Sequence, residues 1–147
     1  MPTRSPAATA EAAAHALAVM VAANGRIDER EMRTLTALDA FRRLGVARHR
    51  FVALACQCLA VLRAQRCDRP WLSAADTAYL NAVFDAVDCL EDRLFVCRLA
   101  AAVITADGRV TSDERLVYDH ALTRWQISPA MVTTAILQDR RRLTLMA

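Results

Sequence analysis

Two stretches of the chain repeat one pattern at a displacement of 83 residues: Ala23-Asn24-Gly25-Arg26-Ile27-Asp28-Glu29-Arg30-Glu31 and Ala106-Asp107-Gly108-Arg109-Val110-Thr111-Ser112-Asp113-Glu114. Four of the nine positions are identical, and two others pair Asn with Asp and Ile with Val. An Asn-Gly or Asp-Gly pair tolerates left-handed backbone angles and turns the chain. The Ile or Val that follows can anchor the turn in the core. We therefore expect each copy to join two helices.

The polar residues of each copy have an ordinary structural role. Asp28 followed by Glu31, and Thr111 followed by Glu114, have the spacing of a capping box. In that motif two side chains bind backbone N–H groups that are left free at the start of a helix. Turn formation and helix capping thus explain the spacing without any ligand.

Composition predicts helices around these turns. Hydrophobic residues make up 55% of the 147 residues, but aromatic residues only 5%, and there are 3 Gly and 4 Pro. Ala and Leu favour helices, whereas a sheet needs more β-branched and aromatic residues. Apolar residues also recur at spacings of three and four almost throughout. We expect one all-α domain over residues 1–147, a compact bundle of about seven helices with an internal pseudo-symmetric repeat.

The expected helices cover residues 5–23, 29–43, 46–65, 73–88, 90–106, 112–126 and 128–142. The second is expected to end at Gly45. It should bury a stripe of five apolar residues, namely Met32, Leu35, Leu38, Phe41 and Leu44.

The arrangement of helix, Ala-Asp-Gly-Arg-Val-Thr-Ser-Asp-Glu and helix at 106–114, with its earlier copy at 23–31, resembles the TerB-like family. This is the helical domain of tellurite-resistance type that also forms the N-terminal part of the DjlA membrane co-chaperones. The resemblance covers residues 10–137. It implies two pseudo-symmetric helical units and an accessory or scaffolding role in stress-related systems, without catalysis.

The resemblance also implies candidate metal ligands, because members of the family have been linked to metal ions through acidic residues near these turns. The matching positions are Asp107, Asp113 and Glu114 in one copy, and Asn24, Asp28 and Glu31 in the other. Calcium or magnesium suits such oxygen ligands. Asn24 departs from the pattern because an amide replaces the expected acid, which weakens a ligand role for the first copy.

An EF-hand calcium loop is excluded in both copies. With Glu114 at the last loop position, the first two ligand positions fall on Val103 and Thr105. With Glu31 there, they fall on Met20 and Ala22. A high-affinity EF-hand needs carboxylates at those positions.

Charged residues form two basic clusters and one acidic cluster. The basic ones are Arg42-Arg43 with Arg48-His49-Arg50, and Arg140-Arg141-Arg142; the acidic one comprises Asp85, Asp88, Glu91 and Asp92. The basic clusters can contact phosphates or an acidic partner, although arginines at solvated helix ends are the simpler interpretation. A net charge of only +3, without interleaved aromatics or a DNA-binding motif, disfavours nucleic acid.

The sequence offers no familiar catalytic or zinc motif. Four of the five cysteines lie in apolar helical runs, where a free thiol acts as a small hydrophobe, which favours the reducing cytoplasm. No Cys-x-x-Cys or His-x-x-x-His pair is present for zinc, and no Gly-x-Ser-x-Gly elbow for a nucleophile. The apolar run at 16–23 is too short to cross a bilayer, so we expect no membrane span.

These observations leave two principal hypotheses. The first is a cytoplasmic, non-enzymatic adaptor of tellurite or general stress resistance that binds other proteins; a homo-oligomer is compatible with it. The alternative is a divalent-cation-binding protein that uses Asp107, Asp113, Glu114, Asp28 and Glu31. The two differ in whether those carboxylates converge or cap their own helices. An enzyme with an unrecognised site would instead show a deep pocket lined by convergent polar groups.

Overall fold

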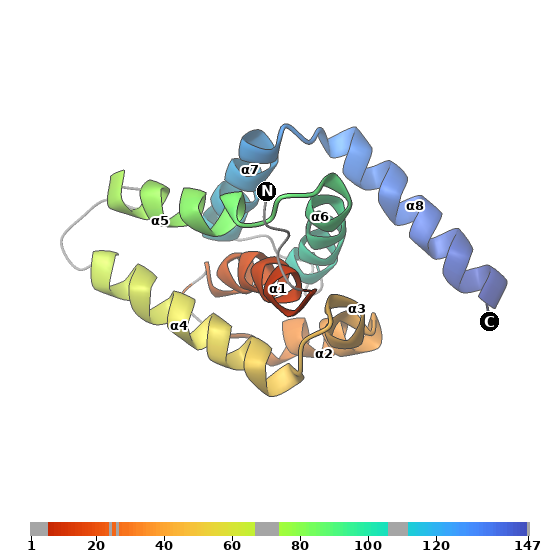
Figure 1. The fold of residues 1–147 in the computed structure, drawn as a ribbon, viewed down its shortest axis with the longest axis horizontal. Coiled ribbons are helices and arrows are strands. Elements are labelled where there is room, and N and C mark those ends of the chain that lie inside the picture. The colour runs from red at the N-terminus through yellow and green to blue at the C-terminus, as the bar shows by residue number, and fades with distance from the viewer. Residues whose placement is uncertain (1–5, 24, 26, 67–73, 106–111, 147) are drawn as a thin grey trace.

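The computed structural model describes residues 6–23, 25, 27–66, 74–105 and 112–146, and these form eight helices with no strand (Figure 1). The helices are α1 (Pro6–Ala22), α2 (Glu29–Ala37), α3 (Ala40–Leu44), α4 (Arg48–Arg66), α5 (Ala74–Asp85), α6 (Leu90–Ile104), α7 (Ser112–Trp125) and α8 (Pro129–Met146). The predicted all-α bundle is confirmed.

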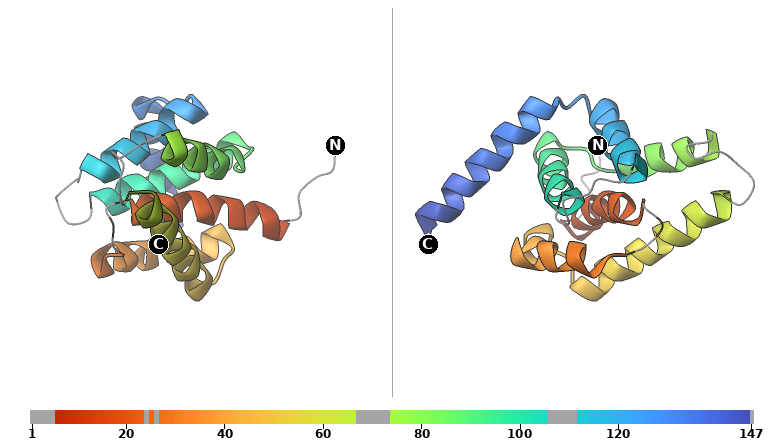
Figure 2. Two further views of the ribbon diagram at one scale, coloured as in Figure 1. Left: turned by 90° about the vertical axis from the view of Figure 1, so that its left-hand side faces the viewer. Right: turned by 180° about the vertical axis from the view of Figure 1, so that it is seen from behind.

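Helix α1 forms the centre of the bundle. It contacts α3, α4, α5, α6 and α7. Helices α2, α3 and α4 lie on one side of it, and α5, α6 and α7 on the other (Figures 1 and 2). Every residue from 16 to 23 is buried, and a helix that is apolar all round is expected in such a position. The small alanine side chains in this run leave room for neighbouring helices on every face.

The predicted continuous helix over 29–43 is wrong at its centre, because the chain breaks between α2 and α3. Leu38 closes α2, and Asp39 adopts left-handed angles with φ 56°. The expected apolar stripe has a strict spacing of three, which turns by about 240° around a straight helix over its length. The break changes the direction of α3 relative to α2, so that Leu44 is buried and Phe41 still packs against the core. Asp tolerates left-handed angles better than most residues.

Two other predicted helix boundaries agree with the structure, whereas the helix expected to reach Asp88 ends at Asp85. Gly45 ends α3 with φ 81°, and its N–H binds the carbonyls of Phe41 and Arg42. Ser128 starts α8, where its Oγ accepts a hydrogen bond from the backbone N of Met131 at 3.2 Å. Helix α8 runs four residues further than predicted, to Met146. The expected cap at Ser73 lies outside the described residues.

Helix α8 lies on the outside of the molecule. Val132 is buried and Ile136 packs against the core, and α8 contacts α6 (Figure 1). Its C-terminal end extends beyond the other helices. Across the described ranges, no helix has both the length and the hydropathy to cross a membrane.

Candidate functional site: a groove between α3, α6 and α8

The acidic residues of the first repeated segment lie at the start of α2. Asp28 is the N-cap, and its Oδ1 accepts a hydrogen bond from the backbone N of Arg30 at 2.7 Å. Glu31 follows in the first turn and is only 4% exposed. The predicted capping role of Asp28 is therefore confirmed.

The acids of the second segment occupy the start of α7. Asp113 and Glu114 both lie in its first turn, and Glu114 is only 3% exposed. Helices α2 and α7 start at Glu29 and Ser112, which are equivalent positions of the repeated pattern. Asn24 and Asp107 lie outside the described residues. The two copies thus share a helix start and a buried glutamate.

The predicted metal ligands are not gathered into one site within the described ranges. No group of three or more His, Cys, Asp or Glu among those residues can hold a metal ion. Asp28 uses one of its oxygens as a cap, so it would not offer both to an ion. The described members of the set, Asp28, Glu31, Asp113 and Glu114, do not by themselves build a calcium or magnesium centre.

A polar cluster within the core joins α1, α4 and α5. Nε2 of His15 lies 3.4 Å from the Tyr79 hydroxyl, which donates to Sγ of Cys58 at 3.5 Å. Burial raises the pKa of Cys58 to about 11, with the Tyr79 hydrogen bond opposing the shift. A thiol with this pKa is almost wholly protonated at neutral pH, and it lacks the thiolate that a nucleophile needs.

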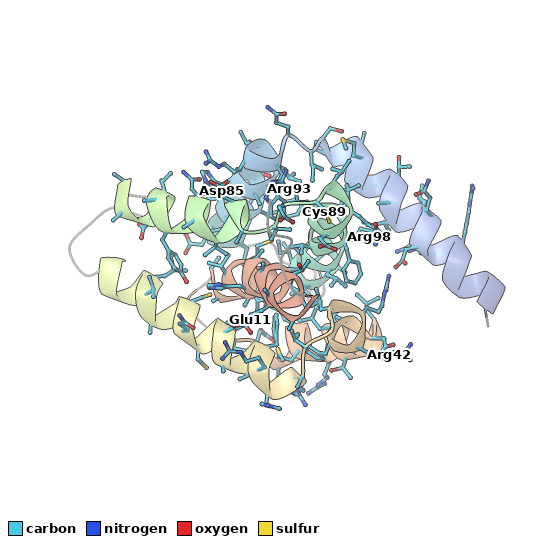
Figure 3. All side chains as sticks on the ribbon, viewed as in Figure 1. Glu11, Arg42, Asp85, Cys89, Arg93 and Arg98 are labelled. Carbon is cyan, nitrogen blue, oxygen red and sulfur yellow. The ribbon has the colours of Figure 1, made fainter. Side chains whose placement is uncertain are left out.

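A second cluster ties α8 to α3 and α6. The guanidinium of Arg43 donates to both carboxylate oxygens of Asp139, at 2.7 and 3.3 Å. Nη1 of Arg98 lies 3.4 Å from Oδ1 of the same carboxylate and also donates to the Ala135 carbonyl at 3.5 Å. Figure 3 shows Arg98 on α6, beside α8. One aspartate from α8 is therefore held between arginines of two other helices.

Both arginines stack on one aromatic ring. The guanidinium carbon of Arg43 lies 4.7 Å from the centroid of the Phe95 ring, and that of Arg98 lies 5.1 Å from it. The side chains of Arg43, Arg98 and Asp139 are 25%, 21% and 17% exposed. Partial burial strengthens their attraction relative to a fully solvated pair. Stacking also restricts the rotation of the guanidinium groups.

These residues border a hollow of about 320 Å³, here called the α6–α8 groove. Its apolar lining comprises Leu38, Phe95, Leu99, Ala101, Ala102 and Ile136. Its charged lining comprises Arg43, Arg98, Asp139 and Arg140. Three of these four charged residues are arginines. The groove therefore combines an apolar surface with an edge rich in arginine.

The sequence contained a partial signal for this groove. Arg43 belongs to the first basic cluster and Arg140 to the second, and the fold brings both to one hollow. Phe95, Arg98 and Asp139 were not singled out by any motif. Of the acidic set, Asp92 lines a separate hollow that adjoins Phe95 and Arg43, and Asp85 pairs with Arg124 at 2.7 Å.

Comparisons with known proteins found no relative: no family model, no curated protein and no solved structure matches the chain. The geometry of the chain itself therefore has to support any functional proposal.

Proposed function

We propose that the chain is a non-enzymatic adaptor that binds another protein through the α6–α8 groove. The observation that carries this proposal is the combination of a stacked arginine pair and an apolar lining in one accessible hollow. Interface centres are enriched in aromatic residues and arginine. Binding energy concentrates on such residues where neighbouring contacts exclude water.

The resemblance to the TerB-like family suggests the setting of this adaptor. Two copies of the repeated sequence pattern, each followed by a helix with a buried glutamate in its first turn, support it. On this proposal the partner belongs to a tellurite or general stress response, and the chain acts in the cytoplasm.

The groove can be blocked without removing its charges. Ala102 is half-buried and lines the groove, so Ala102→Trp would fill it with a large side chain. Ala78→Trp on the exposed surface of α5 makes the same chemical change away from the groove. Melting curves of both variants establish whether each remains folded.

Affinity capture from the native host, quantified by mass spectrometry, tests the adaptor function. Proteins retained by the wild type and by Ala78→Trp, and lost with folded Ala102→Trp, are the expected result. Equal retention by Ala102→Trp would place the interaction elsewhere on the surface. Repeated failure to retain any specific protein would contradict the adaptor function.

A divalent-cation-binding function is the second proposal, and the burial of the equivalent residues Glu31 and Glu114 favours it. Calorimetric titration of calcium and magnesium into the metal-free protein tests it. Saturable binding lost in both Asp107→Asn and Glu114→Gln would support the cation. If neither metal binds and the two variants only melt at lower temperature, the acids serve the turns and helix starts.

A further inference from the structure

We propose that two copies of this chain pair through the exposed side of α8, with their α8 helices antiparallel. The apolar surface involved, here called the outer α8 face, comprises Ala130, Met131, Thr134 and Leu137 of α8 with Leu90 and Leu94 of α6. None of these residues lines the α6–α8 groove, so the pairing is separate from the proposed adaptor function. Three properties of the outer α8 face support it: its lack of charge, its shape and the opposite charges at its two ends.

The outer α8 face is an uncharged surface on the outside of the molecule. Helix α8 contacts the rest of the bundle on one side only, and a helix in such a position normally has charged residues on its solvent side (Figures 1 and 2). No charged residue occurs in α8 before Asp139. Leu137 is instead 52% exposed and Met131 37%, and Leu90 of α6 is 53% exposed. A surface that lacks charge and includes methionine is typical of the centre of a protein interface.

The outer α8 face has an apolar hollow next to a projecting apolar side chain. Leu94, Ala130, Met131 and Thr134 border a hollow of about 350 Å³ between α6 and α8. Leu137 follows Thr134 by three residues, so it projects from α8 about one turn beyond the hollow. The same face thus provides both a side chain to insert and a place to receive one.

This arrangement is self-complementary. In a dimer with a twofold axis, both copies use the same patch, so each contact occurs twice with the roles exchanged. Ala130, Thr134, Leu137 and Arg141 have spacings of four, three and four, which place them along one side of α8. With the helices antiparallel and the axis between Thr134 and Leu137, Leu137 of each copy enters the hollow of the other.

The charges at the two ends of the face fit the same antiparallel register. Glu91 is exposed at the start of α6, one turn before Leu94, and thus lies toward the Ala130 end of the face. Arg141 is exposed at the opposite end, about 16 Å from Ala130 along α8. Antiparallel pairing places Arg141 of each copy opposite Ala130 of the other, on the side of Glu91. Opposite charges at such positions fix the register of an interface.

Other charged groups near the start of α6 leave this end of the face acidic. Asp88 is exposed just before the helix and adds negative charge. Arg93 is directed toward the end of the preceding segment, where its Nε donates to the Val87 carbonyl at 2.7 Å. The acids also make an anionic membrane a poor occupant of this face, because such surfaces attract basic segments. A second copy offers the matching charge as well as the matching shape.

Sedimentation velocity of the full chain at increasing concentration tests the pairing. We expect the wild type to associate reversibly into a dimer. Leu137→Glu places a charge at the centre of the interface and should weaken dimerisation about a hundredfold, which is about tenfold for each of the two equivalent sites. Leu116→Glu is the matched control, since Leu116 of α7 is 44% exposed and lies outside the face. It should associate as the wild type does. Melting curves establish whether both variants are folded.

Exchanging the charges tests the register. Arg141→Glu and Glu91→Arg each place like charges opposite each other at two equivalent points, and each should weaken dimerisation about tenfold. In an equimolar mixture of the two variants, both contacts again join an arginine to a glutamate. We therefore expect a heterodimer with an affinity near that of the wild-type dimer, followed by sedimentation with one variant labelled by a fluorophore.

Three results would overturn the inference: a monomer at every concentration, a dimer that folded Leu137→Glu does not weaken, or a charge-exchanged mixture that associates no better than its components. A dimer that Ala102→Trp abolishes and Leu137→Glu leaves intact would also overturn it, because the second copy would then occupy the α6–α8 groove. If Leu137→Glu does not fold, the charge exchange decides alone, since Glu91 and Arg141 are exposed. Loss of the dimer in each charge variant and its return in the mixture would support the inference.

Discussion

His15 and His120 are held half-buried between helices of this bundle. The His15 ring meets Tyr79 edge-on, with centroids 6.4 Å apart, and Nε2 of His120 lies 2.8 Å from Oδ1 of Asn81. Burial lowers the pKa of His15; Glu11 opposes this shift and Arg50 adds to it. Burial also lowers the pKa of His120, and the charge of Arg124 adds to it.

The two histidines predict an acid-sensitive stability. Because their pKa values are lower in the folded protein, the unfolded chain binds their protons more readily. Their contribution is therefore complete above the ordinary pKa of 6.5 and is lost as the pH falls below it toward the folded values. Urea unfolding followed by circular dichroism should show this loss between about pH 7.5 and pH 5.5.

Replacing these histidines should flatten that dependence. In His15→Gln with His120→Gln, the free energy of unfolding should change less over the same range, because neither site takes up a proton. His49→Gln is the control, since His49 is exposed on α4. Glu11 and Asp85, whose pKa values are lowered by hydrogen bonds from Arg50 and Arg124, add a loss only at lower pH. An unchanged slope in the double variant would contradict the assignment.

The positions of the helix ends depend both on local residues and on the tertiary fold. Asp28 and Ser128 start helices with hydrogen bonds that their sequence patterns predict. Helix α7 ends without a glycine: Gln126 adopts φ 55°, and the following N–H of Ile127 binds the Leu122 carbonyl at 2.9 Å. Left-handed angles are costly for a residue with a Cβ. Gln126 is therefore poorly suited to the left-handed conformation that it adopts at the end of α7.

Gln126→Gly should stabilise the protein. Gln126 is exposed, so the change removes little packing, while glycine accepts the left-handed angles without strain. We expect a gain of about 0.5–1 kcal/mol in the free energy of unfolding, reduced in part by the greater entropy of the unfolded glycine chain. Chemical denaturation monitored by circular dichroism measures this gain.

Gln138→Gly provides the opposite case. Gln138 is exposed within α8, so the same substitution there should lower the stability by about 1 kcal/mol. If both variants were destabilised, the φ of Gln126 would not be the controlling factor.

At the scale of the whole molecule, the features that could be predicted from the sequence are those that depend on residues of a single helix. Gly45 marked a helix end and Ser128 a helix start, because both depend on local residues. The break at Asp39 was missed because a spacing of three still resembles a helix over short distances. The α6–α8 groove could not be predicted, since Arg43, Phe95 and Asp139 meet only after three helices pack together.

The burial of the cysteines could also be predicted only in part. Cys58 and Cys97 are buried as expected, but Cys56 and Cys89 are exposed. Cys56 occupies an outward position of α4, and the Cys89 sulfur accepts a hydrogen bond from the backbone N of Asp92 at the start of α6. An apolar run in sequence does not show which of its residues faces the core.

These thiols should report whether the bundle unfolds as one unit. Cys58 on α4 and Cys97 on α6 belong to a single core cluster, and burial raises their pKa values to about 11 and about 12. In a Cys67→Ser background, a thiol-reactive disulfide reagent should modify Cys56 and Cys89 quickly. Cys58 and Cys97 should react slowly and to the same extent, because both become accessible to the reagent only when the whole bundle unfolds.

Peptide mass spectrometry at increasing urea concentrations measures this protection for each cysteine. Free energies of opening for Cys58 and Cys97 that match each other, and that match global unfolding by circular dichroism, are the expected result. Cys58→Ser and Cys97→Ser identify the two slow peptides. Faster modification of Cys58 would mean that α4 detaches from α1 while α6 stays packed. The bundle would then comprise two cooperative units, with the α6–α8 groove in the more stable one.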